Sequence, residues 1–235
     1  MYYRLSEFWR VGYHASPLDV SLEYQDGFGR FDDPQREFAV LYGGDSATTC
    51  ILEVALPWKQ HVDATYIEQS EAPDEEMDAD EQRLALEQAE RDREIAKRPP
   101  TMPASLYDKV KVFVQLVSPI VLCDLDDVAV RTQLSKVPAV ATAMAACDVS
   151  QLDRSVITAQ GPHLEITRAI SGFLMRDAFG GHQFAGIRTI SRWKGEVFAL
   201  FQERYELGSP LVGPIRLHRD DPDVVQAATM TGLVP

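Results

Sequence analysis

Glu53 is the residue whose type and surroundings best suit chemistry. At 100° per residue along a helix, it shares one side with Ser46, Thr49 and Cys50, whereas the apolar side chains of this segment gather on the other side. Small neighbours leave room for a ligand beside the carboxylate. A surface glutamate among small side chains fits the same pattern, so the residues alone leave both interpretations open.

The elements around Glu53 follow from the stretch GFGRFDDPQREFAVLYGGDSATTCILEV, residues 27–54. Its glycines free the backbone beside Arg30, and the Asp33-Pro34 pair favours a turn. The apolar run 37–42 predicts a buried strand that ends at Tyr42. Two glycines follow, and Asp45 is a favourable N-cap for a helix over residues 45–56.

The rest of the chain predicts an α+β fold with a split, mostly antiparallel sheet flanked by helices. Strands are expected at the N-terminus and at residues 109–116, 119–124, 185–191 and 196–201, and helices at 126–134, 138–147 and 163–178. Strands and helices do not alternate regularly, and no GxGxxG or GxxxxGK[ST] motif follows a strand. Rossmann and P-loop folds are therefore disfavoured.

The charge of the chain is strongly negative and unevenly placed. With 36 acidic and 23 basic residues the formal charge is -13, which disfavours direct binding to nucleic acid. Much of the acidity lies in a segment with few large apolar residues, which ends at two prolines. We therefore expect one domain over residues 1–235 with an exposed, acidic helical insertion at about 64–100. The insertion is either a solvated excursion or an arm that binds a partner.

Several common classes of protein are disfavoured. The five histidines show no close ligand spacing and the three cysteines no CxxC pair, so no metal site or disulfide framework is predicted. No GxSxG motif indicates a hydrolase. No apolar run is long enough to span a bilayer, and the first residues do not resemble a signal peptide. We expect a cytoplasmic protein without membrane contact.

Two blocks of the sequence resemble the RES domain family. The family has an aromatic-arginine pair, a G-R-[FW]-[ND]-P turn, a strand ending in Leu-Tyr, and a glutamate eleven positions after that tyrosine. The matching residues here are Tyr3-Arg4, Gly29-Arg30-Phe31 with Asp33-Pro34, Leu41-Tyr42 and Glu53. The second block is a helix, a Gly-Ile strand and a serine, and it is matched by residues 164–179, Gly186-Ile187 and Ser191.

The resemblance implies an ADP-ribosyltransferase-like enzyme that acts on NAD+ and needs no other cofactor. It implies that Glu53 stabilises the positive charge on the ribose during cleavage of the nicotinamide-ribose bond. Arg4 and Arg30 would hold pyrophosphate or ribose oxygens, Tyr42 would lie against nicotinamide, and the Ser191 hydroxyl would orient the substrate. Arg4, Glu53 and Ser191 are the expected catalytic residues, and all five are expected to bind NAD+. Arg192, Trp193 and Lys194 form a further candidate for anion binding.

Many proteins of this family are toxins paired with an Xre-type helix-turn-helix antitoxin, so the resemblance implies such a partner. The expected reaction is NAD+ glycohydrolysis or phosphorolysis that depletes cellular NAD+. Two alternatives stay open: a mono-ADP-ribosyltransferase that modifies a protein, and an inactive RES-like module that binds through the acidic arm. Assembly into a homo-oligomer also stays open.

Overall fold

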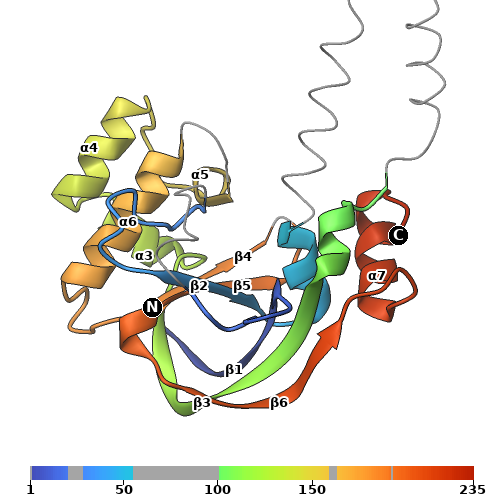
Figure 1. Cartoon of the computed structure of the whole chain (residues 1–235). Coiled ribbons are helices and arrows are strands. Elements are labelled where there is room, and N and C mark those ends of the chain that lie inside the picture. The colour runs from blue at the N-terminus through green and yellow to red at the C-terminus, as the bar shows by residue number, and fades with distance from the viewer. Residues whose placement is uncertain (1, 21–28, 55–100, 159–162, 192) are drawn as a thin grey trace, which may run out of the picture. The chain divides into compact units, whose positions relative to one another are not determined.

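The computed structural model describes residues 2–20, 29–54, 101–158, 163–191 and 193–235, and they form two compact units (Figure 1). The first unit comprises Met1–Cys50 and Lys109–Arg216, and the second comprises Ile51–Asp108 and Leu217–Pro235. The acidic helical insertion predicted at about 64–100 lies outside the described residues, and the single-domain assignment stays a prediction.

The first unit contains a six-stranded sheet. Its strands are β1 (Tyr2–Tyr13), β2 (Val40–Gly44), β3 (Lys109–Asp124), β4 (Gly186–Ile190), β5 (Glu196–Phe201) and β6 (Leu207–Arg216). The order is β1-β2-β5-β4-β3-β6, and β1 also pairs with β3, so the sheet closes on itself. Among the strands that the structure describes, only β3 and β4 pair in parallel, while the other pairings are antiparallel. The prediction of an α+β fold with a mostly antiparallel sheet is confirmed.

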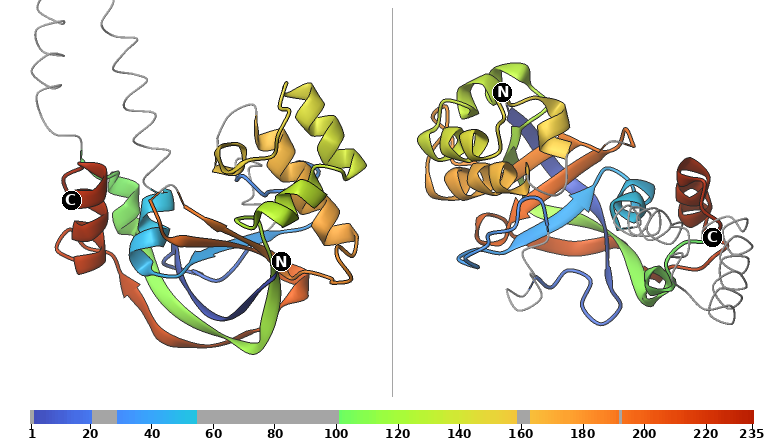
Figure 2. Two further views of the ribbon diagram at one scale, coloured as in Figure 1. Left: turned by 180° about the vertical axis from the view of Figure 1, so that it is seen from behind. Right: turned by 90° about the horizontal axis from the view of Figure 1, so that it is seen from above.

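Helices cover one side of this sheet. They are α3 (Val128–Leu134), α4 (Pro138–Ala146), α5 (Arg154–Thr158) and α6 (Leu164–Arg176), and they gather over β2, β4 and β5 (Figures 1 and 2). The predicted helices at 126–134, 138–147 and 163–178 correspond to α3, α4 and α6, whereas α5 was not predicted. A six-residue strand was likewise predicted at 196–201 and is found there as β5.

Two predicted strands are a single element. Residues 109–116 and 119–124 both belong to β3, which continues through Pro119. Proline is tolerated there because β6 pairs with β3 only as far as Leu116. The strand β6 was not predicted, because Pro210 and Pro214 interrupt its apolar pattern.

The sheet separates two apolar clusters in the first unit. Alternation along β2 sends Val40 into a cluster shared with the helices and Leu41 into a cluster enclosed by the strands. We call these the helix-side core and the strand-side core. The helix-side core receives Ile166, Ile170 and Leu174, which follow the period of α6.

The second unit is described only in part. It contains the 3-10 helix η2 (Ala104–Asp108) and α7 (Pro222–Thr231). The carboxylate of Asp221 caps α7 by accepting the N–H of Asp223, and Gly232 ends the helix in a left-handed conformation. Met102 donates its N–H to the carbonyl of Val234 over 2.7 Å, which joins the two segments of the unit. No described helix has the length and apolar character needed to cross a membrane.

Candidate active site

Arg10 is the arginine of β1 that enters the interior of the first unit. Its Nη1 group donates to the carbonyl of Tyr42 over 2.7 Å, and its Nε group donates to the carbonyl of Pro17. Burial lowers the pKa of the guanidinium. The Nη2 group has no hydrogen-bond partner among the described residues. Arg10 is therefore fixed by two carbonyl groups within the first unit.

Arg4, which was predicted for the site, lies on the outer side of β1. Its side chain is exposed, whereas Leu5, the next residue, is buried in the strand-side core. Neighbouring residues in a strand point to opposite faces, so Arg4 is directed away from that core. The structure does not bring Arg4 to Tyr42; Arg10 of the same strand donates instead to the backbone carbonyl of Tyr42.

Tyr42 is held at both ends. Its ring packs against the helix-side core, and its hydroxyl accepts the N–H of Phe31 over 3.0 Å and donates to Asp32 over 2.8 Å. Burial, and then the charge of Asp32, raises the pKa of the phenol well above its ordinary value. Tyr42 therefore stays neutral, and its ring and its hydroxyl are both held in place.

The loop that carries Arg30 is built on this tyrosine. The N–H of Gly29 donates to Asp32 over 2.8 Å. A Cβ atom at Gly29 would lie 2.5 Å from the Tyr42 hydroxyl and from a carboxylate oxygen of Asp32, so this close approach requires glycine. The partly buried Arg30 points its Nη1 group at the carbonyl of Ile157 over 3.4 Å. The structure thus joins the Gly29–Asp32 loop to Tyr42 on the helix side of the sheet, whereas the side chain of Arg10 lies on the strand side, on the same face as Phe8, and meets only the backbone carbonyl of Tyr42.

Ser191 lies in the turn between β4 and β5. It is fully buried, and its Oγ accepts the N–H of Trp193 over 3.1 Å. Its own N–H donates to the carbonyl of Gly195 over 2.7 Å, and Lys194 takes a left-handed conformation with φ 75°. Ser191 therefore shapes this turn. Arg192 of the predicted anion-binding group lies outside the described residues.

Glu53 lies in the helix over residues 47–54, where its side chain is partly buried. The helix begins with Ser46, whose Oγ accepts the N–H of Thr49 over 3.1 Å. The cap is thus Ser46 rather than the predicted Asp45, because Asp45 accepts the N–H of Glu196 over 3.0 Å and ties the helix start to β5. Glu53 belongs to the second unit, and the other four predicted site residues belong to the first.

A second polar cluster was not predicted from the sequence. Arg188 of β4 donates to Asp124 over 2.8 Å and to Glu196 over 2.6 Å, and its guanidinium lies 5.5 Å from the ring centre of Tyr3. Burial, followed by the neighbouring Glu196, raises the pKa of Tyr3 to about 12. The arginine is thus held between two carboxylates and an aromatic ring.

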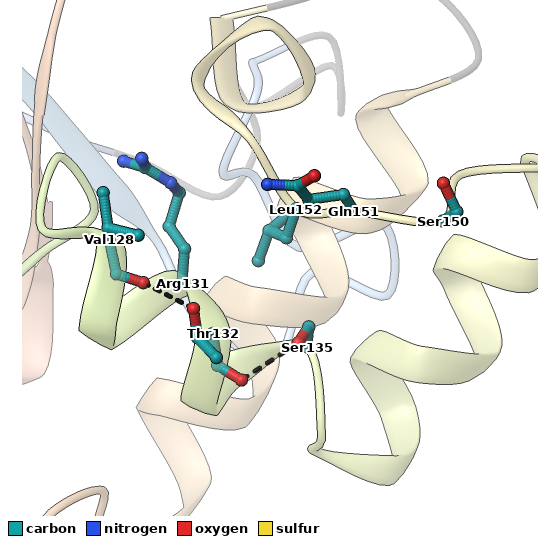
Figure 3. Close-up of a pocket in the computed structure, with 7 residues that line it drawn as sticks. All are labelled: Val128, Arg131, Thr132, Ser135, Ser150, Gln151 and Leu152. Carbon is teal, nitrogen blue, oxygen red and sulfur yellow. Dashed lines mark hydrogen bonds between the residues drawn. The ribbon is translucent and has the colours of Figure 1, made fainter.

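A pocket of about 280 Å³ lies apart from these clusters, between α3 and the segment 150–152 (Figure 3). Polar and apolar side chains both line it, namely Val128, Arg131, Thr132, Ser135, Ser150, Gln151 and Leu152. The Nη1 group of Arg131 donates to the carbonyls of Leu125 and Asp126. None of the predicted site residues lines this pocket. Among the described residues, no group of His, Cys, Asp or Glu side chains could hold a metal ion.

Sequence reasoning missed Arg10 and Asp32, although signals for both were present. Trp9-Arg10 is a second aromatic-arginine pair, six residues after Tyr3-Arg4. Asp32 lies in the same turn as the predicted Asp33-Pro34 pair. For Arg188 the sequence holds no comparable signal, since its partners Asp124 and Glu196 come from other strands.

The comparisons with known proteins confirm the resemblance to the RES family. The model of the RES domain matches residues 7–108, so this part of the chain carries a RES domain sequence. The match contains Arg10, Arg30, Tyr42 and Glu53, whereas Arg4 precedes it and Ser191 follows it.

Among solved structures, the chain is similar to one from the crystal structure of the M. tuberculosis MbcT-MbcA toxin-antitoxin complex. The two chains share 12% identity with a TM-score of 0.49, over 98% of this chain and 89% of that chain. A likeness of this size supports no conclusion about activity. The comparison with curated proteins found no match.

Proposed function

We propose that this chain is a RES-type toxin-like enzyme that consumes NAD+ by cleaving the nicotinamide-ribose bond. The observation that carries the proposal is the RES match over residues 7–108, which contains Glu53, Arg10, Arg30 and Tyr42. Water or phosphate would attack the ribose carbon while the carbon-nitrogen bond breaks, and an attacking water would release one proton to solvent. The bonding electron pair leaves with nicotinamide, which departs neutral.

The residues would divide this work by charge. The carboxylate of Glu53 would stabilise the positive charge that grows on the ribose in the transition state. Guanidinium groups suit the pyrophosphate, and we prefer Arg10 to Arg4 because Arg10 lies within the residues that match the RES model and is fixed inside the first unit, whereas Arg4 is exposed. The roles of Arg4, Arg30, Tyr42 and Ser191 in NAD+ binding stay predictions, and no further cofactor is needed in this scheme.

The proposal extends to biology through the family. An enzyme that drains NAD+ would harm the cell that makes it, so we propose an Xre-type antitoxin as the partner. Expression of the chain alone should slow growth and lower cellular NAD+, and co-expression of its antitoxin should relieve both effects. Unrestrained expression with normal NAD+ would contradict the toxin role.

The decisive experiment is incubation of the purified chain with NAD+, with and without phosphate. Release of free nicotinamide is expected, and its dependence on phosphate separates a phosphorylase from a glycohydrolase. Labelled protein in place of soluble product would identify a mono-ADP-ribosyltransferase. Unchanged NAD+ in every arm would favour the inactive binding module.

The variant Glu53→Gln tests the central residue. Loss of one well-placed electrostatic contact costs about 3–4 kcal/mol in the transition state, so nicotinamide release should fall by a factor of about 100–1000. The thermal transition should barely move. The matched control is Glu203→Gln, which alters an exposed glutamate in the first unit and should leave the rate unchanged. Full activity in a folded Glu53→Gln variant would remove Glu53 from the mechanism.

A further inference from the structure

The outer face of β1, β3 and β6 carries apolar side chains. Trp9 and Phe113 are register partners whose ring centres lie 5.0 Å apart, and both are partly exposed. On β6, Val212 lies opposite Phe113 with 40% of its surface exposed, and Ile215 is 42% exposed. We call Trp9, Phe113, Val212 and Ile215 the outer apolar stripe; it is interrupted by Lys111, which pairs with Ile215 and Val11 on the same face and is 8% exposed.

The described helices of the first unit leave this stripe uncovered. α3, α4, α5 and α6 lie over β2, β4 and β5, and none of them lies beneath β3 and β6 (Figures 1 and 2). The aromatic pair belongs to this outer face because the flanking Phe8 and Val112 are buried in the strand-side core. Exposed apolar side chains gathered on the outside of a sheet are typical of an interaction surface.

The charges at the two ends of the stripe have opposite signs. Lys109 lies beyond one end, with its Nζ 3.7 Å from the ring centre of Tyr13, its register partner. Glu7 lies beyond the other end, opposite Gln115, and is exposed. Six positions of β1 separate Tyr13 from Glu7, or about 20 Å of strand. The positive and negative ends therefore lie on either side of the apolar centre.

We infer that this face binds a second copy of the same chain. A two-fold axis through the apolar stripe would pack the stripes of the two subunits against each other. It would also bring Lys109 of each subunit next to the partner subunit's Glu7, so the ion pair would form two times. An apolar centre with a charged rim is the usual anatomy of such interfaces. The contact is made by side chains rather than by pairing of β6 edges, because Pro210 and Pro214 have no N–H to donate. This inference does not depend on the proposed NAD+ chemistry.

The mass of the full chain in solution tests the interface. Sedimentation and light scattering should give twice the chain mass of 26.3 kDa. Val212→Glu places a charge at the centre of the stripe and should yield single chains. The matched control is Val128→Glu, since Val128 of α3 is 64% exposed and lies outside the stripe. Single chains for the unaltered protein at about 100 μM would overturn the inference, as would a two-chain mass for Val212→Glu.

Charge reversal tests the pairing across the two-fold axis. Lys109→Glu and Glu7→Lys should each raise the dissociation constant about tenfold, because each creates two repulsive pairs in a symmetric interface. The double variant restores opposite signs and should return to within about threefold of the original value. A double variant that is weaker than either single variant would overturn the arrangement. Thermal unfolding of each variant verifies that the chains are folded.

Discussion

Two aromatic-arginine pairs lie on the same strand, and the structure uses them differently. Tyr3-Arg4 leaves its arginine exposed, whereas Trp9-Arg10 delivers its arginine to the carbonyl of Tyr42. Regular alternation over six residues would place both arginines on one face. The register with β3 shifts between Leu5 and Glu7, and this irregularity reverses the phase of the strand. A bulge therefore decides which arginine enters the interior.

Among variants of these two arginine environments, Arg10→Ala is expected to have the largest effect on the free energy of unfolding. It leaves two carbonyl groups, those of Tyr42 and Pro17, without a charged donor in a buried setting. We expect the free energy of unfolding to fall by about 3–5 kcal/mol, measured by denaturant titration. Arg10→Lys keeps the charge, but an ammonium does not reproduce the planar fork of the guanidinium. Its free energy of unfolding should therefore lie between those of Arg10→Ala and the unaltered chain. An unchanged midpoint for Arg10→Ala would show that Arg10 is not a structural anchor.

The next largest effect is expected for Arg188→Met, on the Tyr3 side of the comparison. The substitution leaves Asp124 and Glu196 without their shared cation, and both carboxylates are about three-quarters buried. The expected loss is about 2–3 kcal/mol, which partial exposure keeps below the value for a fully buried pair. Arg176→Met is the control, because its ion pair with Glu37 has both side chains more than half exposed. Equal losses in the free energy of unfolding for Arg188→Met and Arg176→Met would contradict the distinction between a partly buried and an exposed ion pair.

The pH dependence of stability sharpens the description of Tyr3. Its pKa is raised from 10.0 to about 12, so the unfolded chain loses this proton at a lower pH than the folded chain. The stabilisation is therefore complete below pH 10 and is lost as the pH rises from about 10 to 12. The free energy of unfolding of Tyr3→Phe should fall less steeply with pH over this interval than that of the unaltered chain. Identical slopes would place the hydroxyl in water.

The smallest effect on stability is expected for Arg4→Ala. An exposed arginine on the outer side of a strand contributes little packing, so the free energy of unfolding should change by less than about 0.5 kcal/mol. The Michaelis constant for NAD+, measured beside that of Arg10→Lys, decides between the two arginines. If Arg4→Ala raises it and Arg10→Lys does not, the predicted role of Arg4 stands and our preference for Arg10 is wrong.

Local patterns predicted much of the first unit, because burial imprints a period on the sequence. The periodic apolar positions of α6 and the continuous apolar runs of β2 and β5 predicted these elements. The strand β6 did not, since an edge strand with exposed faces needs no apolar alternation. Proline and glycine could occupy it without loss of a core contact.

The candidate site was less accessible to sequence reasoning. Tyr42 and Arg30 were identified through a motif, and the structure joins them through Asp32 and Phe31. The position of Arg10 depends on a bulge, and the Arg188 cluster depends on strand pairings that are distant in the chain. Such relations are set by tertiary register, which no local window contains.

The pairing of β1 with β3 also has a consequence for the kinetics of folding. Tyr13 pairs with Lys109, so roughly a hundred residues must be closed into a loop before the longest pairing of the sheet can form. Closure entropy grows only logarithmically, and removal of residues 68–98 would change it by just a few tenths of a kcal/mol. The sheet should therefore form slowly and late in any version of this chain. A nascent chain would hold β1 without its partner until β3 has been synthesised, which makes the N-terminal strand the segment most in need of protection from aggregation.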